Sequence, residues 1–95
     1  MAAYLIAEVD VHDEGQFEEY KKLVPATIMR YGGKYLARGG RVETLEGDWL
    51  PKRLVIIEFD TAEQAKSWWA SAEYSDAKRL RQSCARTQMI LIESP

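Results

Sequence analysis

Residues 53–59, Arg-Leu-Val-Ile-Ile-Glu-Phe, give the strongest strand signal in the chain. Branched and aromatic residues dominate this run, and its apolar side chains fall on both sides of the pleat. Residues 3–11 and 87–93 have the same character, so the sequence predicts three strands that are apolar on both faces. A sheet built from such strands needs cover on each face.

A glycine-rich stretch, Gly33-Lys34-Tyr35-Leu36-Ala37-Arg38-Gly39-Gly40, comes before this strand. We expect a further strand at Lys34–Arg38, with a bulge or bend at the two glycines that follow it. Residues 41–45 alternate again between polar and apolar, which predicts that the strand resumes there. A loop over residues 46–52 then returns the chain to the strong strand. The whole stretch is expected to form a bent hairpin at the sheet edge, where it would meet a second subunit.

Two capping-box-like starts, Asp13-x-x-Gln16 and Thr61-x-x-Gln64, mark the beginnings of two helices. Apolar residues at spacings of three or four give the first helix one buried face: Phe17, Tyr20, Val24, Ile28 and Tyr31. Pro25 is expected to remove one backbone hydrogen bond and to kink this helix. The pair Gly32-Gly33 is expected to end it.

In the second helix, Trp68 shares a stripe with Ala65 and Ala72, so Trp68 is expected to face the sheet and Trp69 a flank. Residues 71–75 interrupt the pattern, and Asp76–Ser83 predicts a third, shorter helix.

The predicted order is βαββαβ, with an extra helical turn before the last strand. This order predicts one α+β domain over residues 1–95, a ferredoxin-like sandwich in which both helices pack on one face of a four-stranded antiparallel sheet. The second face of the sheet is also apolar. Because the same face of another copy is the simplest cover for it, we expect a homodimer formed through the sheet faces.

Composition excludes several classes of function. A net charge of −2 and a pI near 5.4 give no electrostatic basis for binding nucleic acid or an anionic membrane. The N-terminal apolar run is too short for a signal peptide or a membrane span. Cys84 is the sole cysteine, which excludes an internal disulfide and fits a cytoplasmic protein. No metal-ligand spacing, phosphate loop or dinucleotide fingerprint occurs, so we expect neither metal nor cofactor.

The chain also resembles a known family. The resemblance covers essentially the whole chain and lies in the order and spacing of these segments: Tyr31-Gly-Gly33, Arg38-Gly-Gly40, Leu45-Glu-Gly47, Arg53, Glu58-Phe59, Ala65, Trp68, Ser71, Tyr74 and Leu80-Arg81. They are similar to those of the domain-of-unknown-function-1330 family, in the dimeric α/β-barrel superfamily. The resemblance implies a homodimer whose two sheets face each other. It carries no activity over to this chain.

Relatives in that superfamily include cofactor-free monooxygenases, haem-degrading enzymes, muconolactone isomerases and peroxidases. The resemblance implies a ligand cavity between the sheet and the helices of one subunit. The catalytic residues of these relatives differ from branch to branch, so none is assigned here, and a shared fold does not decide function.

Arg38 is the first candidate for such a site, since it ends a strand beside glycines that allow close backbone approach. Its guanidinium could hold a carboxylate or enolate. It could equally form a salt bridge with Glu43, Glu46 or Glu58.

Glu46 and Arg53 flank the loop that contains Trp49. They could supply a general base and its charge partner, provided that Glu46 is partly buried. The alternative is a structural pair that closes the loop or contacts the other subunit.

Trp68 and Tyr74 could form an aromatic wall for a planar ligand, and both could equally belong to the core. The Tyr74 hydroxyl needs a hydrogen-bond partner if it is buried. His12 is the only histidine and is expected to be exposed, with proton transfer as its alternative role. Cys84 is expected to be buried or partly buried.

Two functional hypotheses follow. In the first, the protein binds or converts a small aromatic or enolisable metabolite, as a cofactor-independent monooxygenase or isomerase would. In the second, it is an accessory or structural dimer without catalysis. A cavity with Arg38 or Tyr74 pointing into it favours the first hypothesis, and a filled core with Arg38 fully paired favours the second.

Overall fold

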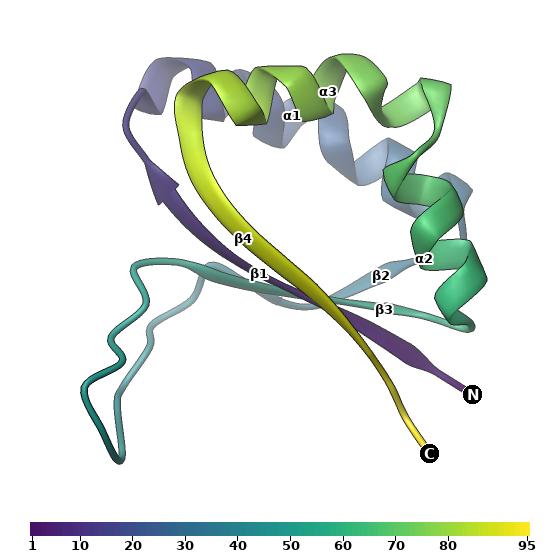
Figure 1. Ribbon diagram of the computed structural model, residues 1–95. Helices are drawn as coiled ribbons and strands as arrows, with labels where there is room; N and C mark the ends of the chain where they lie inside the picture. The colour runs from purple at the N-terminus through teal and green to yellow at the C-terminus, as the bar shows by residue number, and fades with distance from the viewer.

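Four antiparallel strands form one sheet in the order β2-β3-β1-β4. The computed structural model describes residues 1–95 and gives these strands the following bounds: β1 Ala3–Val11, β2 Lys34–Arg38, β3 Leu54–Phe59 and β4 Ala85–Glu93. The helices are α1 Glu14–Arg30, α2 Ala62–Trp69 and α3 Ala72–Cys84. All three helices lie on one side of the sheet, and the other side is uncovered (Figure 1). The predicted ferredoxin-like sandwich is confirmed.

Side-chain caps begin each helix. Asp13 Oδ1 accepts the backbone N–H of Gln16, and Thr61 Oγ1 accepts that of Gln64, each at 3.1 Å. Both predicted capping starts are therefore confirmed. Ser71 Oγ does the same for Tyr74 N, so α3 begins at Ala72 rather than at Asp76. The apparent break at residues 71–75 is a helix cap.

The core lies between the sheet and the helices. Along β1 the odd-numbered residues from Ala3 to Val9 are buried on the side of the helices, as strand alternation requires. The core that they join includes Ile28 of α1, Trp68 of α2 and Phe59 of β3. The even-numbered residues of β1 point to the uncovered face and are half-buried. Apolar residues on both faces of the sheet are therefore confirmed.

The predicted bend at the two glycines is confirmed at Gly39, whereas the register shift of β2 lies earlier, between Tyr35 and Ala37. The prediction that a strand resumes at residues 41–45 is wrong. Residues 41–45 form no strand, because Gly39 has a left-handed backbone (φ 71°) and no neighbouring strand pairs with the chain beyond it. Residues 39–53, which we call the arm, instead project as a long loop beyond the sheet (Figure 1).

None of the helices has the length and apolar character needed to cross a membrane.

Candidate functional site

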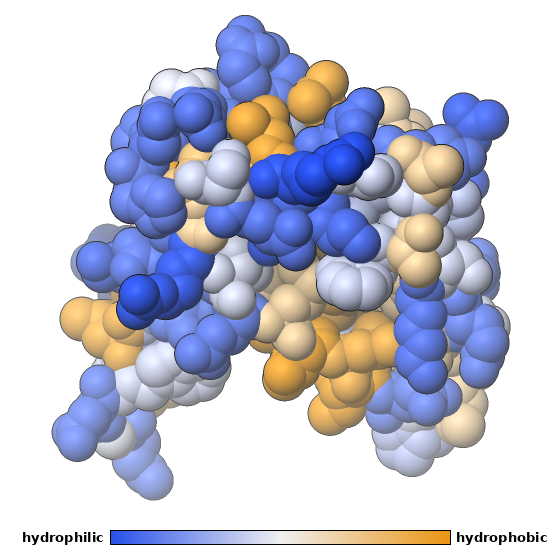
Figure 2. Space-filling model, turned by 45° about the horizontal axis from the view of Figure 1, so that its top comes forward, coloured by the Kyte–Doolittle hydropathy of each residue, from blue (hydrophilic) through white to orange (hydrophobic).

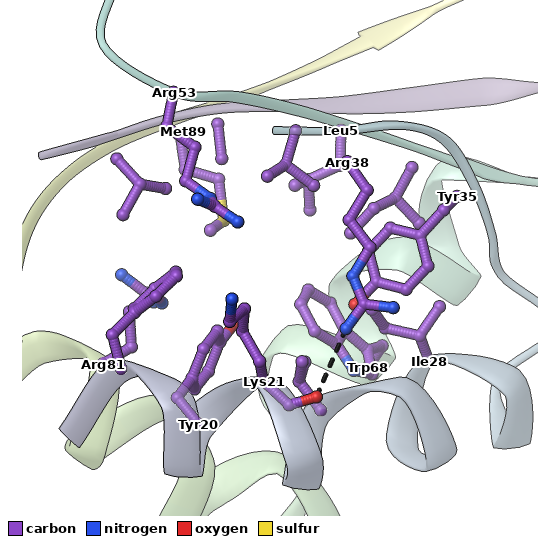
Figure 3. Close-up of a pocket in the computed structure, with 16 residues that line it drawn as sticks. Leu5, Tyr20, Lys21, Ile28, Tyr35, Arg38, Arg53, Trp68, Arg81 and Met89 are labelled. Atoms are coloured by element: carbon purple, nitrogen blue, oxygen red, sulfur yellow. Dashed lines mark hydrogen bonds between the residues drawn. The ribbon is translucent and has the colours of Figure 1, made fainter. Parts of the chain in front are cut away.

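A cavity of about 40 Å³ lies between the covered face of the sheet and the helices. Sixteen residues line it, and twelve of them are hydrophobic. Figure 3 shows Leu5, Tyr35 and Met89 reaching it from the sheet, and Tyr20 and Trp68 from the helices. This volume holds a few water molecules, so a larger ligand requires side chains at the edge of the cavity to move.

Arg38 reaches the cavity from the end of β2. Its guanidinium carbon lies 4.5 Å from the centre of the Tyr35 ring, and its Nη2 donates to the carbonyl of Lys21 at 3.2 Å. That carbonyl is free because Pro25, four residues later in α1, has no N–H to donate to it. The predicted loss of a helix hydrogen bond thus creates an acceptor for Arg38.

The predicted ion pairs of Arg38 are absent. Glu58 pairs with Lys34 at 3.3 Å, Glu43 pairs with Arg41 at 3.6 Å, and Glu46 is exposed on the arm without an ion pair. Arg38 is exposed at the edge of the cavity, and most of its donors have no protein partner, so the interpretation as a fully paired structural residue is wrong.

Arg53 lines the same cavity, although not with its predicted partner. It precedes β3, and its guanidinium carbon lies 5.0 Å from the centre of the Phe17 ring. No ion pair joins it to Glu46, whose exposed position removes the condition on which its role as a general base rested. The Arg53 side chain also packs against Gly39, where an added Cβ would lie 2.7 Å from the guanidinium carbon. Arg53 therefore links the base of the arm to the cavity.

A chain of hydrogen bonds runs along the helical side of the cavity. The hydroxyls of Tyr20 and Tyr74 lie 2.9 Å apart, and Arg81 Nε donates to the Tyr74 hydroxyl at 3.2 Å. All three side chains are buried. Burial raises the pKa of Tyr20 well above its usual value, so this hydroxyl stays protonated at neutral pH.

Trp68 and Tyr74 form an aromatic stack with ring centres 4.1 Å apart. Trp68 lines the cavity and donates its Nε1–H to Thr27 Oγ1 at 3.0 Å. Tyr74 lies behind it and does not line the cavity. Trp69 is 44% exposed, as expected for a flank position, and lies under the Lys78 ammonium, whose nitrogen is 3.7 Å from the ring centre.

His12 and Cys84 lie outside the cavity. His12 is exposed between β1 and α1, as expected, and its backbone N–H donates to the Cys84 carbonyl at 2.9 Å. Cys84 is buried, and this burial raises the pKa of its thiol. No group of three or more His, Cys, Asp or Glu side chains could hold a metal ion.

The structure therefore brings Arg38, Arg53 and Trp68 to one cavity and leaves Glu46, His12 and Tyr74 outside its lining. It adds Tyr20, Lys21 and Arg81, which the sequence analysis did not single out as site residues. Tyr20 and Lys21 could have been found from their place on α1, opposite the sheet. Arg81 belongs to one of the segments that carry the family resemblance, but nothing near it in the sequence indicated that it is buried, because burial of an arginine depends on tertiary packing.

A second, more open hollow of about 250 Å³ lies between α2 and the edge strand β4. Six of its seven lining residues are apolar, and Lys66 is the exception. Figure 2 shows apolar surface gathered in the lower middle of the view, beside the protruding arm. With one polar side chain, this hollow has little to orient a ligand.

A family model described as "Domain of unknown function (DUF1330)" matches residues 2–95. The chain belongs to this family. The resemblance seen in the sequence is thus confirmed over almost the whole chain. A comparison with curated proteins found no match.

Solved structures resemble this DUF1330 protein in fold. A protein of unknown function from Rhodopseudomonas palustris superposes with a TM-score of 0.80 at 16% identity, covering 99% of this chain and 82% of that one. SnoaB, a cofactor-independent oxygenase from Streptomyces nogalater, superposes with a TM-score of 0.69 at 10% identity, covering 99% of this chain and 93% of that one. A dimeric protein of unknown function and ferredoxin-like fold from Bacteroides fragilis superposes with a TM-score of 0.58 at 15% identity, covering 98% of this chain and 96% of that one. At these identities the likeness extends to the fold alone.

Proposed function

We propose that this DUF1330 protein binds a small aromatic or enolisable metabolite in the cavity between sheet and helices. The observation that carries the proposal is the set of cationic side chains that reach an otherwise apolar cavity: Lys21, Arg38, Arg53 and Arg81. A few polar groups directed into an apolar hollow are typical of small-molecule sites. A core that served only for packing would hold such groups outside or pair them.

A ligand larger than the present cavity can enter if the long side chains at the cavity edge move aside. The Arg38 guanidinium is held by one hydrogen bond of 3.2 Å to a carbonyl, and Lys21 by an exposed ion pair of 2.6 Å with Glu18. Contacts of this kind contribute about 1 kcal/mol or less each. A ligand that displaces them therefore loses little of its own binding free energy.

Catalysis is the second candidate, and the same cations favour it. Guanidinium groups at the cavity, of which Arg81 is buried, Arg53 half-buried and Arg38 exposed, would stabilise the negative charge that develops on an enolisable ligand. The cofactor-independent oxygenase among the structural neighbours fits this candidate at the level of fold. NMR can distinguish catalysis from binding alone by following the exchange of the ligand's acidic C–H with solvent deuterium. A binding protein without catalysis leaves the exchange rate unchanged.

A thermal-shift screen of aromatic and enolisable metabolites tests the binding proposal. At a concentration one hundred times its Kd, a ligand adds about 2.7 kcal/mol to stability. For a domain of this size, that raises the melting temperature by about 10–20 °C. Arg38→Ala should reduce the shift, and Arg86→Ala, which removes an exposed arginine outside the cavity, should not. Ligands that stabilise wild type and Arg38→Ala equally would remove Arg38 from the site.

We further propose that the protein is a homodimer in which the uncovered sheet faces pack together. Ile56, Ile6 and Ile90 stand side by side across β3, β1 and β4 on that face. Ile90 is 62% exposed in the single chain, so this apolar sheet face is open to solvent unless another molecule covers it. The arm projects beyond the sheet and carries three further exposed apolar residues, Leu45, Trp49 and Leu50. A second copy would cover both the face and the arm. Sedimentation at micromolar concentration should give twice the 10.9 kDa of one chain.

A further inference from the structure

Arg81 is an unusual residue for a protein interior. It lies near the end of α3, is only 5% exposed, and lines the cavity. Its single hydrogen bond runs from Nε to the Tyr74 hydroxyl, which is a neutral acceptor. A guanidinium has five N–H donors and a full positive charge, so most of its hydrogen-bonding capacity is unused. Its two Nη atoms have no protein partner, and neither is fully buried, since Thr87 Oγ1 is the one fully buried side-chain polar atom without a hydrogen bond. A largely buried charge of this kind is stabilised when a group of opposite charge binds to it.

The acidic residues of the chain do not supply that partner. The chain contains 15 Asp and Glu residues, yet none of them lines the cavity. None of the seven ion pairs includes Arg38, Arg53 or Arg81. Lys21 is the one cation of the cavity that is neutralised, by Glu18 at 2.6 Å. Three unneutralised guanidinium groups therefore reach one cavity in a protein whose net charge is −2.

The three guanidinium groups come from separate parts of the fold. Arg38 ends β2, Arg53 precedes β3, and Arg81 lies on α3 on the opposite side of the cavity (Figure 3). The aromatic rings of Tyr35 and Phe17 hold the first two in place, and the Tyr74 hydroxyl holds the third. The guanidinium groups of Arg53 and Arg81 are thus held around the space between sheet and helices before any ligand is bound, which lowers the ordering cost of binding. Arg38, at the edge, moves to admit the ligand.

We propose that the ligand of this cavity is an anion, a carboxylate or enolate with a flat apolar body, whose charged oxygens bind Arg81. Arg38 and Arg53 bind the same charge from the sheet side. The planar guanidinium matches a carboxylate with two parallel hydrogen bonds, and removal from water strengthens this pairing. The apolar lining, which includes Trp68 and Tyr20, contacts the body. This inference rests on the proposed function and adds the charge and the anchoring residue of the ligand.

Matched pairs of probes test the charge of the ligand. Benzoate and phenylacetate carry the carboxylate, and benzamide and phenylacetamide have nearly the same shape without the charge. Isothermal titration with wild-type protein should show carboxylates binding roughly tenfold or more tightly than their amides. If amides bind as well as carboxylates, the cavity is still a ligand site and the anionic class is wrong. If neither class binds, the proposed function fails together with this inference.

Arg81→Met tests the anchor, since methionine keeps an unbranched apolar stem and removes the charge. Benzoate should bind this variant roughly tenfold or more weakly. Arg79→Met is the matched control, because Arg79 lies on the same helix, is exposed, and pairs with Asp76 at 2.9 Å. This control should bind benzoate as the wild type does. Unchanged affinity in Arg81→Met would overturn the inference.

Melting temperature separates ligand binding from a structural role for Arg81. Arg81 makes no ion pair and one hydrogen bond, to a hydroxyl that keeps Tyr20 as a partner, so the ligand-free Arg81→Met variant should melt within a few degrees of the wild-type temperature. A structural arginine would lower the melting temperature when removed, and that result would count against a ligand anchor. Should the methionine variant fail to fold, Arg81→Lys keeps the charge but loses the planar donor pair. It should then show weaker benzoate binding with a normal melting temperature.

Discussion

Replacement of Trp68 by alanine is expected to lower the free energy of unfolding by about 3–5 kcal/mol. Trp68 is 1% exposed, stacks on Tyr74 at 4.1 Å and donates to Thr27 Oγ1. The substitution removes these contacts and leaves a void that joins the existing cavity. Urea unfolding at one fixed protein concentration measures the loss, since dimerisation would make apparent stability depend on concentration.

Trp69→Ala is the matched control for this prediction. Trp69 is the next residue of α2, but it is 44% exposed and its main contact is with Lys78. Its removal should cost about 1 kcal/mol or less. Equal losses for the two variants would contradict the assignment of Trp68 to the core and of Trp69 to the flank.

A lysine at position 90 is expected to separate the proposed dimer. Ile90 is 62% exposed in the single chain, so Ile90→Lys leaves the fold of one subunit intact. In a dimer formed through the sheet faces, each copy would bury an unpaired ammonium. We expect a cost of about 4 kcal/mol or more, which raises the dimer Kd about 1,000-fold. Sedimentation velocity should then show a 10.9 kDa particle at micromolar concentration.

Met29→Lys provides the control for the dimer variant. Met29 is 74% exposed near the end of α1, on the helical side of the molecule, and a positive charge is favourable there. The variant has the same change in charge and a similar loss of apolar surface, and it should remain dimeric. A dimer that survives Ile90→Lys would mean that the copies associate through another surface.

The sequence was sufficient for the fold because each strand carries a strong local pattern. The apolar runs of β1 and β3 and the caps at Asp13 and Thr61 depend on residues close together in the chain, and all appear in the structure as expected. The start of α3 is harder to predict, because Ser71 can either break a helix or cap one, and here it caps α3. Residues 41–45 alternate like a strand, but a strand also needs a partner, and none is available there.

The site was only partly predictable, for a different physical reason. Arg38 could be selected from its place at a strand end beside glycines, and Trp68 from its helical stripe. The burial of Arg81 and the absence of acids around it result from the packing of α3 against α1 and the sheet. The contact between Arg38 and the carbonyl freed by Pro25 likewise joins two elements. Such properties belong to the assembled fold, so a linear pattern does not contain them.

The claim that the cavity is a ligand site is tested most directly by the arginine side-chain Nε–H signals in ¹H–¹⁵N spectra. The chain has seven arginines, so the signals can be assigned one by one with arginine-to-methionine variants. Titration with benzoate at mildly acidic pH should shift the signals of Arg38, Arg53 and Arg81 and then saturate. Those of Arg30, Arg41, Arg79 and Arg86 should stay in place, since these residues lie outside the cavity. Shifts that grow without saturation at all seven arginines, or that omit Arg81, would contradict the account.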